Sequence, residues 1–381
     1  MRIGFDASML GKGGGIATYA ECLLAALGRL GGGHSFALWC ARPAAGPVAR
    51  RLALRGATVV APGVGGRLWD RWSRLAWGNP LPIEALVGPV DVFHGPNYFL
   101  PAQRGRAARV VTVHDLSALR HPEWHPASRV LMHRAGLRRT LRAVDHVITD
   151  TEAVRAEVIA TCGVPPDRVT SIHPAAPPGF LPRRPSELKP ILDPWGLAVG
   201  DYLLWAGAIE PRKNLVRLLQ AVAAVQARRG DMPPLVLAGP PGWRNREIRR
   251  RIDAARPGVR HLGYLPDEGL AALMAGCTAL VMPSLYEGFG LPVIEAMASG
   301  VPVVTSRGGA LEEVAGNAAV LVDPHDPEAI GAGIESLLHD TSLRATLAQK
   351  GLARAAQFSW ERTARETLRV YERAIASRGL R

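Results

Sequence analysis

The stretch Ala279-Leu280-Val281-Met282-Pro283-Ser284-Leu285-Tyr286-Glu287-Gly288-Phe289-Gly290-Leu291-Pro292-Val293-Ile294-Glu295 decides the fold of the second half of this chain. The short apolar run Ala279–Met282 predicts a buried strand. Pro292 is suited to the start of a helix, and Gly300 is suited to its end. A strand, a glycine-containing turn and a helix in this order are the unit of a parallel sheet covered by helices.

The turn between this strand and this helix has the features of an anion site. Gly288 and Gly290 allow a ligand to approach the backbone closely. The amides of Phe289–Leu291 are expected at the helix N-terminus, where the helix dipole favours an anion. Glu287 and Glu295 flank this anion site with carboxylates, which bind hydroxyl groups. A phosphate beside a polyol indicates a nucleotide sugar.

Length and composition favour a soluble protein of two domains, since the chain has 381 residues with 48% hydrophobic and 21% charged content. No apolar run reaches a membrane-spanning length. The N-terminus, Met1–Asp6, has the pattern of a short strand that ends in the acidic residue Asp6. This is not the pattern of a signal peptide. We therefore expect a cytoplasmic protein. The cysteines lack metal-ligand or redox spacing and are expected to be buried thiols: Cys22, Cys40, Cys162 and Cys277.

The formal charge of +13 is carried mainly by arginine, because 46 basic residues less 4 lysines leave 42 arginines. This bias is compatible with codon usage in a GC-rich genome, or with an anionic partner. No signature of a nucleic-acid-binding module is present, so nucleic acid is not an expected partner. A phosphorylated substrate and an anionic membrane surface are favoured.

Strands and helices alternate in both halves, which predicts parallel sheets covered on both faces. Strands are expected in the first half at Arg2–Asp6, Ser35–Cys40, Ala57–Val60, Val90–His94, Val110–His114, His146–Asp150 and Val169–His173. Strands are expected in the second half at Tyr202–Ala206, Leu235–Ala238, Val259–Leu262, Ala279–Met282, Val301–Thr305 and Ala319–Val322. In doubly wound sheets of this kind, ligands bind beyond the carboxyl ends of the strands.

The domain limits follow from a proline-rich stretch in the middle of the chain. Prolines at the density found near residues 181–200 are expected to interrupt helices and central strands, so this stretch is predicted to be a linker. It would separate an acceptor-binding domain at 1–180 from a nucleotide-sugar-binding domain at 201–359. A C-terminal helix at 360–381 is expected to pack back on the first domain.

A second candidate phosphate site is Gly207-Ala208-Ile209-Glu210-Pro211-Arg212-Lys213-Asn214, between a strand and the expected helix Leu215–Arg229. Arg212 can bind a phosphate through two parallel hydrogen bonds, and Lys213 adds a compact charge. A solvated loop with a helix cap at Asn214 is the plainer alternative. The combination with the Glu287–Glu295 segment favours the phosphate site.

Together these residues resemble the donor site of glycosyltransferase family 4, whose members are retaining enzymes of the GT-B fold. The resemblance rests on the Gly207–Asn214 stretch and on the spacing of Glu287 and Glu295, and it covers nearly the whole chain. It implies an α/β protein of two Rossmann-like doubly wound domains facing a central cleft. The residues that would bind the donor by this resemblance are Gly207, Arg212, Lys213, Glu287, Gly288, Phe289, Gly290, Leu291 and Glu295.

The resemblance also assigns roles to these residues. Arg212 and Lys213 would hold the donor diphosphate together with the Phe289–Leu291 amides. Glu295 would bind the ribose hydroxyls, and Glu287 would contact the donor sugar near the reacting carbon. The chain has no Asp-x-Asp pair for a metal-held diphosphate. The two cations would therefore replace a metal ion, and no metal or other cofactor is expected.

The loop Gly11-Lys12-Gly13-Gly14-Gly15-Ile16 follows the first strand. A dinucleotide-binding fingerprint would have glycine in place of Ile16 and an acid after the second strand, so NAD is not expected. The family resemblance implies a flexible loop that closes near the donor phosphate and the acceptor, with Gly14 and Gly15 nearest to them. A plain tight turn is the alternative.

Three histidine-containing segments are further candidates. His114 ends a strand, and the family resemblance places it near the donor sugar; a structural histidine is the alternative. His94 and Asn97 lie in His94-Gly95-Pro96-Asn97-Tyr98, which resembles the matching segment of mannosyl- and rhamnosyl-transferring members, as does His121-Pro122-Glu123. Acceptor contacts and a turn forced by Gly95-Pro96 are equally favoured explanations.

Two arginine-rich segments of the first half are candidates for membrane contact. One contains Arg67, Arg71 and Arg74 beside tryptophans, and the other contains Arg138 and Arg139. Basic amphipathic helices of this kind can lie on an anionic bilayer, which would place the enzyme on the inner face of the cytoplasmic membrane. Core-packed helices with a solvated arginine face are the alternative.

The expected activity is the retaining, metal-independent transfer of a hexose from a nucleoside-diphosphate sugar, with GDP-mannose as the preferred donor. The acceptor would be a glycolipid or polysaccharide in bacterial surface-glycan synthesis. A nucleotide-sugar epimerase or hydrolase of the same fold is one alternative. A non-enzymatic basic protein that binds RNA or a membrane is the other.

Overall fold

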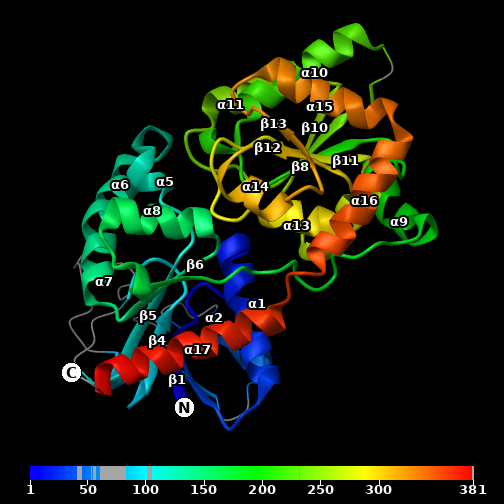
Figure 1. Ribbon diagram of the computed structural model, residues 1–381. Coiled ribbons are helices and arrows are strands. Elements are labelled where there is room, and N and C mark those ends of the chain that lie inside the picture. The colour runs from blue at the N-terminus through cyan, green and yellow to red at the C-terminus, as the bar shows by residue number, and fades with distance from the viewer. Residues whose placement is uncertain are drawn as a thin grey trace. The chain divides into compact units, whose positions relative to one another are not determined.

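The protein is described by a computed structural model that covers residues 1–40, 45–52, 54, 57–60, 83–100, 105–230 and 232–379. The chain forms two compact units (Figure 1). Unit 1 comprises Met1–Leu116, Leu131–Pro174 and Ser359–Arg381. Unit 2 comprises Ser117–Val130 and Ala175–Phe358. The two units are described separately below.

Unit 1 is built on a parallel sheet in the order β3-β2-β1-β4-β5-β6-β7. Its strands are β1 Arg2–Asp6, β2 Ser35–Trp39, β3 Thr58–Val60, β4 Val92–Gly95, β5 Ala108–Val113, β6 His146–Thr149 and β7 Val169–Ser171. Its helices are α1 Gly15–Leu30, α2 Ala45–Arg51, α4 Glu84–Val87, the π-helix His133–Leu137, α7 Arg138–Ala143, α8 Glu152–Cys162, the 3-10 helix Pro166–Arg168 and α17 Trp360–Gly379. The C-terminal helix α17 packs against α1 and β5 of this unit.

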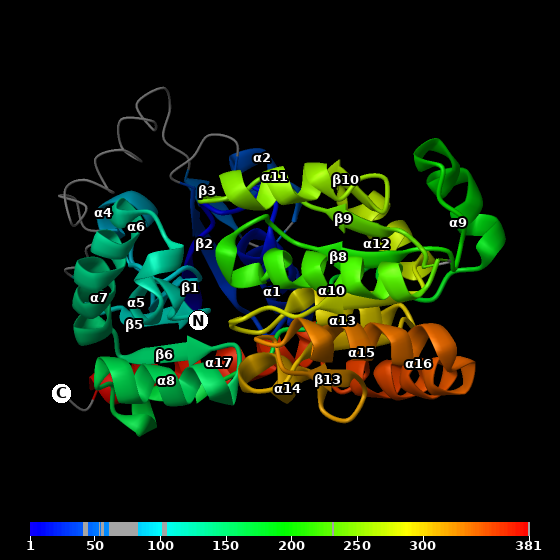
Figure 2. The ribbon, with the colours of Figure 1, turned by 90° about the horizontal axis from the view of Figure 1, so that it is seen from above.

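Unit 2 contains a second parallel sheet, in the order β10-β9-β8-β11-β12-β13 (Figure 2). Its strands are β8 Leu203–Ala206, β9 Leu235–Ala238, β10 Val259–Gly263, β11 Ala279–Met282, β12 Val303–Ser306 and β13 Val320–Val322. Its α-helices are α5 Ser117–Arg120, α9 Pro185–Leu192, α10 Leu215–Arg228, α11 Arg246–Ala254, α12 Asp267–Gly276, α13 Leu291–Ala298, α14 Gly309–Ala315, α15 Pro327–His339 and α16 Thr341–Ala355. Its 3-10 helices are Pro122–Trp124, Asp193–Trp195 and Pro211–Lys213, and α6 Ala127–Met132 crosses the unit boundary.

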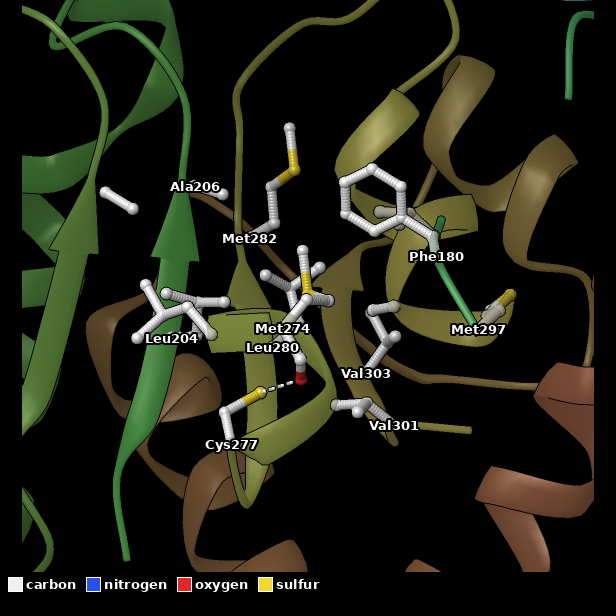
Figure 3. Packing of buried hydrophobic residues seen from close by; sticks show 14 of the residues in the cluster. Phe180, Leu204, Ala206, Met274, Cys277, Leu280, Met282, Met297, Val301 and Val303 are labelled. Carbon is white, nitrogen blue, oxygen red and sulfur yellow. Dashed lines mark hydrogen bonds between the residues drawn. The ribbon is translucent and has the colours of Figure 1, made fainter. Parts of the chain in front are cut away.

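The apolar residues of each central strand divide between the two faces of this sheet, as the period of two in a strand requires. Leu204 and Ala206 of β8 pack on one face with residues of α9, α12 and α13, as Figure 3 shows for part of this cluster. Leu203 and Trp205 pack on the other face with residues of α10, α11 and α15. Both faces are therefore covered, which is why these strands are almost uniformly apolar.

The proline-rich stretch near residues 181–200 contains a helix, so the expectation that its prolines would interrupt helices was wrong. Helix α9 begins with Pro185, where a missing amide hydrogen costs little, and it accommodates Pro190 inside. Leu188 and Leu192 are fully buried in the core of unit 2. Their burial compensates for the hydrogen bond that Pro190 cannot donate. The domain limits at 180, 200 and 359 stay predictions.

The helical run over residues 127–143 is divided into three pieces, because a π-helical turn at His133–Leu137 separates α6 from α7. None of the four cysteines, all of which lie in the described part of the chain, forms a disulfide. Cys40 and Cys277 are buried as expected, whereas Cys22 and Cys162 are only partly buried. The Cys277 thiol donates a hydrogen bond to the Met274 carbonyl oxygen at 3.2 Å (Figure 3).

Candidate active site

The strand order of unit 2 places the candidate donor site at a switch point. β8 and β11 are hydrogen-bonded neighbours, yet the chain leaves β8 toward β9 on one side and leaves β11 toward β12 on the other. The loops after two such strands diverge, and the crevice between them is where parallel sheets bind ligands. The loop after β8 carries Arg212 and Lys213, and the loop after β11 carries Glu287. The two segments singled out in the sequence therefore meet at this point.

Four charged side chains form a chain of alternating sign across the switch point. Arg212 donates from Nε to Glu210 Oε1 at 2.6 Å and from Nη1 to Glu287 Oε2 at 2.6 Å. Lys213 Nζ lies 2.5 Å from Glu287 Oε1. The exposed fractions of these side chains range from 2% for Glu210 to 16% for Arg212. Glu287 therefore bridges both cations in a site that is nearly closed to water.

The two cations keep Glu287 ionised. Burial of this carboxyl opposes its charge, but the nearby Arg212 and Lys213 outweigh burial, so the pKa of Glu287 is lowered. The positive charges of Arg212 and Lys213 are consequently neutralised by carboxylates. A diphosphate that binds here would share or replace the contacts of Glu287 with Arg212 and Lys213.

The backbone around the site is tied together by Asn214. Its amide donates to the carbonyl oxygens of Pro283 at 2.8 Å and Pro324 at 2.6 Å, and it thereby joins three loops. Asn214 precedes α10 with φ of 60°, and its side chain makes no capping hydrogen bond. The helix-cap alternative is therefore not what the structure shows. The Arg212 carbonyl oxygen also accepts from the Leu285 amide at 2.8 Å, so the two loops are fixed to each other.

Glycine is required where the loops come closest. At Gly290, which precedes α13, φ is 91° and a Cβ would lie 2.5 Å from Leu311 Cδ2. Gly207 follows β8 with φ of 149°. A Cβ added at this position would lie 3.6 Å from Lys213 Cε. The helix begins at Leu291, and Gly288 and Phe289 are buried beside it. The predicted amide nest at Phe289–Leu291 thus lies at the N-terminus of α13.

Glu295 lies in the first turns of α13 and is buried, with 6% of its surface exposed. Burial, together with Asp267, raises the pKa of Glu295 to about 8. The carboxyl is therefore largely protonated at neutral pH. Both a protonated and an ionised carboxyl can hydrogen-bond to ribose hydroxyls, so the assigned role stays a prediction.

His114 of unit 1 is buried with both ring nitrogens in use. Nδ1 lies 2.7 Å from Asp150 Oδ2, and Nε2 lies 2.7 Å from the Pro96 carbonyl oxygen. Burial disfavours the charged ring, but Asp150 and the carbonyl outweigh it, so the pKa of His114 is raised. The contact of His114 with the donor sugar stays a prediction, and hydrogen bonding to the sugar would have to replace one of these two bonds.

His94 lies inside the core of unit 1 and has no exposed surface. Its Nδ1 is 2.7 Å from the Tyr371 hydroxyl of α17, and its Nε2 is 2.8 Å from Thr112 Oγ1. Burial lowers the pKa of His94 to about 3, so the ring is neutral. An acceptor contact was predicted for His94, but the structure buries this ring because α17 covers the end of β4.

The remaining candidates of unit 1 are more accessible. Gly14 and Gly15 are exposed, and Gly14 precedes α1 with φ of 85° and open space around its α-carbon. Asn97 is partly buried. Arg138 and Arg139 are exposed on α7. Arg67, Arg71 and Arg74 lie outside the described residues.

No role for Glu210 follows from the sequence alone. The structure places this residue in direct contact with Arg212, and Glu210 Oε2 is buried without a hydrogen-bond partner in the described part of the chain. An acid two residues before a candidate phosphate-binding arginine, in the loop after a buried strand, was the available signal. Its contact with the guanidinium depends on side-chain packing that no spacing rule supplies.

Comparisons with known proteins find glycosyltransferase family models in both halves of the chain. Residues 200–354 match the family model described as Glycosyl transferases group 1, and residues 13–179 match Glycosyltransferase Family 4. The O-antigen chain mannosyltransferase B of Escherichia coli is 40% identical over 283 residues, which are 74% of this chain and 74% of that protein. A D-inositol 3-phosphate glycosyltransferase of Nocardioides sp. is 32% identical over 324 residues, with 76% of this chain and 69% of that protein covered.

Solved structures extend the comparison to the fold. The lipopolysaccharide-biosynthesis glycosyltransferase WaaG has a TM-score of 0.71 at 17% identity, over 96% of this chain and 98% of that chain. Anabaena HepE in complex with UDP and glucose has a TM-score of 0.71 at 19% identity, over 97% and 99%. The family models and the curated relatives are those of glycosyltransferases, so the alternative of a non-enzymatic basic protein is excluded. The chain belongs to glycosyltransferase family 4 and is a hexosyltransferase of the GT-B fold, with two Rossmann-like domains.

Proposed function

We propose that this enzyme transfers mannose from a nucleoside-diphosphate mannose, with GDP-mannose as the preferred donor, to a glycolipid or polysaccharide acceptor in O-antigen synthesis. The proposal for the sugar and the pathway is supported by the similarity to the O-antigen chain mannosyltransferase B. It is also supported by 31% identity over 239 residues to the serotype-specific mannosyltransferase WbdA of Escherichia coli, a match that spans 29% of that protein.

The observation that carries the donor class is the meeting of Arg212, Lys213 and Glu287 at the switch point of unit 2. Negative charge develops on the leaving nucleoside diphosphate as the glycosidic bond breaks. Fixed cations that surround this charge stabilise the transition state more than the ground state. Because the protein supplies these cations itself, we propose a reaction that needs no divalent metal ion.

Retention of the anomeric configuration completes the proposal. The acceptor hydroxyl would attack from the face that the diphosphate leaves, and a phosphate oxygen of the departing group would take the hydroxyl proton. Glu287 would remain an ionised carboxylate beside the donor sugar and would stabilise positive charge on the reacting carbon.

The donor is tested first by thermal-shift screening against GDP, UDP, ADP and their hexoses. A ligand that binds the folded protein raises its unfolding temperature, and we expect GDP and GDP-mannose to give the largest shifts. Selective stabilisation by UDP or ADP would overturn the choice of donor. Release of free mannose or of an epimerised donor without an acceptor would favour the hydrolase or epimerase alternative.

The reaction itself is tested with labelled GDP-mannose and a mannose-terminated oligosaccharide. We expect an α-linked product by NMR and an unchanged initial rate after treatment with EDTA. A β-linked product would contradict retention. Loss of turnover on chelation, with recovery when Mg²⁺ or Mn²⁺ is added back, would contradict metal independence.

We also propose that the enzyme lies on the cytoplasmic face of the membrane and contacts it through unit 1. No helix among the described residues is long and apolar enough to cross a membrane. The helical run around α7 exposes Arg138 and Arg139 together with the apolar Leu131 (61% exposed) and Met132 (39% exposed). Exposed arginines beside exposed apolar side chains suit an anionic lipid surface.

This membrane contact is tested by replacing both Arg138 and Arg139 by Glu. We expect sedimentation with phosphatidylglycerol vesicles to fall by at least about half, since each basic residue near such a surface contributes about 1 kcal/mol. The matched control replaces Arg362 and Arg365 of α17, two exposed arginines of the same unit, by Glu. An equal loss in both variants would show that only net charge matters.

A further inference from the structure

Glu210 is buried at the candidate donor site and contacts Arg212 on the edge opposite to Glu287. Its Oε1 accepts from Arg212 Nε at 2.6 Å, whereas Glu287 accepts from Nη1. The Glu210 side chain is 2% exposed and the Arg212 side chain is 16% exposed. A ligand therefore reaches the guanidinium more readily than the Glu210 carboxylate.

The backbone of Glu210 is fixed by the loops around it. The Glu210 carbonyl oxygen accepts from the Lys213 amide at 3.1 Å, and the preceding Ile209 exchanges backbone hydrogen bonds with the loop after β9. Gly242 of that loop packs so closely that a Cβ there would lie 3.3 Å from Glu210 Cβ. The carboxylate is consequently held in place from its own main chain.

Stability alone does not account for a buried carboxylate in this position. Burial of an ion costs free energy, and Glu210 Oε2 has no hydrogen-bond partner among the described residues. A buried ion pair is in general weak evidence for a stabilising role. The contact of Glu210 with a cation assigned to the donor diphosphate indicates a functional reason for retaining this charge.

We infer that Glu210 is a positioning residue that fixes the orientation of the Arg212 guanidinium for the donor diphosphate. Glu287 pairs through one oxygen with Arg212 and through the other with Lys213, and in the proposed function it faces the donor sugar. Its ion pair with Arg212 would therefore change when the donor binds. Glu210 pairs through Oε1 with Arg212 Nε and remains in contact with that atom. Arg212 thus keeps one fixed edge, at Nε, while its other edge exchanges a carboxylate for phosphate. This inference rests on the phosphate-binding role proposed for Arg212.

The inference is tested by a double-mutant cycle with GDP as the probe, measured by titration calorimetry. Glu210→Ala should weaken GDP binding by about tenfold, the effect of one lost hydrogen bond to a charged group. In an Arg212→Ala background the same substitution should change the affinity less than about twofold, because its action requires the guanidinium. Glu210→Gln should restore most of the affinity, since its amide oxygen can still accept from Nε.

A control and a reserve variant keep the result interpretable. Glu335→Ala removes another glutamate that pairs with an arginine, Arg228, in unit 2, and it should leave GDP affinity unchanged. If Glu210→Ala does not fold, Glu210→Asp withdraws the carboxylate from Nε while keeping its charge, and it should weaken GDP binding and raise the donor KM more than it lowers kcat.

The outcomes separate this inference from the proposed function. Equal weakening by Glu210→Ala in the wild-type and Arg212→Ala backgrounds would overturn the positioning role. Unchanged affinity in folded Glu210→Ala would also overturn it. If Arg212→Ala itself leaves GDP binding intact, the phosphate role of Arg212 fails instead.

Discussion

The two units of this enzyme have the same central strand order but different chemistry at the point where that order reverses. In unit 1 the switch point lies between β1 and β4, and in unit 2 it lies between β8 and β11. The unit 2 switch point contains a chain of buried charges from Glu210 to Lys213. The end of β4 in unit 1 contains instead the neutral His94, closed off by Tyr371 of the C-terminal helix.

This difference shows that strand order sets where a ligand can bind and that the side chains at the strand ends decide what binds. The unit 2 loops present cations and helix-end amides, which suit a diphosphate. The unit 1 loop after β1 presents the exposed glycines Gly14 and Gly15, which offer backbone and space and no charge. The predictions below test whether the charged residues act on the reaction while the neutral network acts only on stability.

The largest effect is expected for Glu287→Gln. The substitution removes the negative charge that we propose lies beside the donor sugar, and it leaves the shape of the side chain nearly unchanged. We expect kcat to fall by about 100-fold or more, a loss typical of removing one group that stabilises charge in the transition state. Nucleotide release from GDP-mannose measures the rate, and circular dichroism checks that the protein is folded. Full activity in a folded variant would remove Glu287 from the mechanism.

Arg212→Ala should have the next largest effect, this time on nucleotide affinity. Loss of charge-assisted hydrogen bonds to a diphosphate should weaken GDP binding by about 10- to 100-fold. Titration calorimetry measures this change. Arg228→Ala is the control, because Arg228 also pairs with glutamates in unit 2 but lies on α10 with partners on α15. Similar losses in both variants would point to a general effect of net charge.

The sequence was a good guide to the strands and to the meeting of the two candidate donor segments. Each of the expected strands of unit 2 lies within two residues of the observed limits, because buried parallel strands are uniformly apolar runs with polar ends. The carboxyl-end rule then placed Arg212 and Glu287 in one crevice without any knowledge of their contacts. The family assignment follows from the same segments.

The parts that the sequence did not predict depend on packing between distant residues. His94 and His114 both lie near the end of a strand, so the sequence does not distinguish them. His94 is covered because α17, more than 260 residues later in the chain, packs over it. Helix α9 contains a proline, and only the burial of Leu188 and Leu192 makes the helical form stable. The contact of Glu210 with Arg212 requires a side-chain orientation that spacing alone does not determine.

A smaller effect, on stability, is expected at Glu295. Burial raises the pKa of this carboxyl to about 8, whereas the unfolded value is about 4.3. Between these values the folded state binds more protons than the unfolded state, so this group lowers the free energy of unfolding as pH rises. Its stabilising contribution is complete below pH ~4.3 and is lost as pH passes about 8, at no more than about 1.4 kcal/mol per pH unit.

Glu295→Gln should remove this dependence. We expect the unfolding temperature of the variant, relative to that of the wild type, to be higher at pH 8.5 than at pH 5.5. Thermal unfolding followed by circular dichroism at both pH values gives the comparison. Glu335→Gln on α15, whose side chain is more exposed, is the matched control. A wild type and a Glu295→Gln variant with parallel pH profiles would show that this carboxyl is ionised throughout the range.

The smallest effect is expected for Tyr371→Phe in unit 1. The substitution deletes the hydroxyl that lies 2.7 Å from His94 Nδ1 and leaves a buried ring nitrogen without its partner, at a cost of about 1–3 kcal/mol. The unfolding temperature should fall by a few degrees, while kcat and the donor KM remain within about twofold of the wild type, because this network is neutral and enclosed. A large fall in kcat without a loss of stability would mean that the end of β4 takes part in the reaction after all, and that the two switch points differ less than their charges suggest.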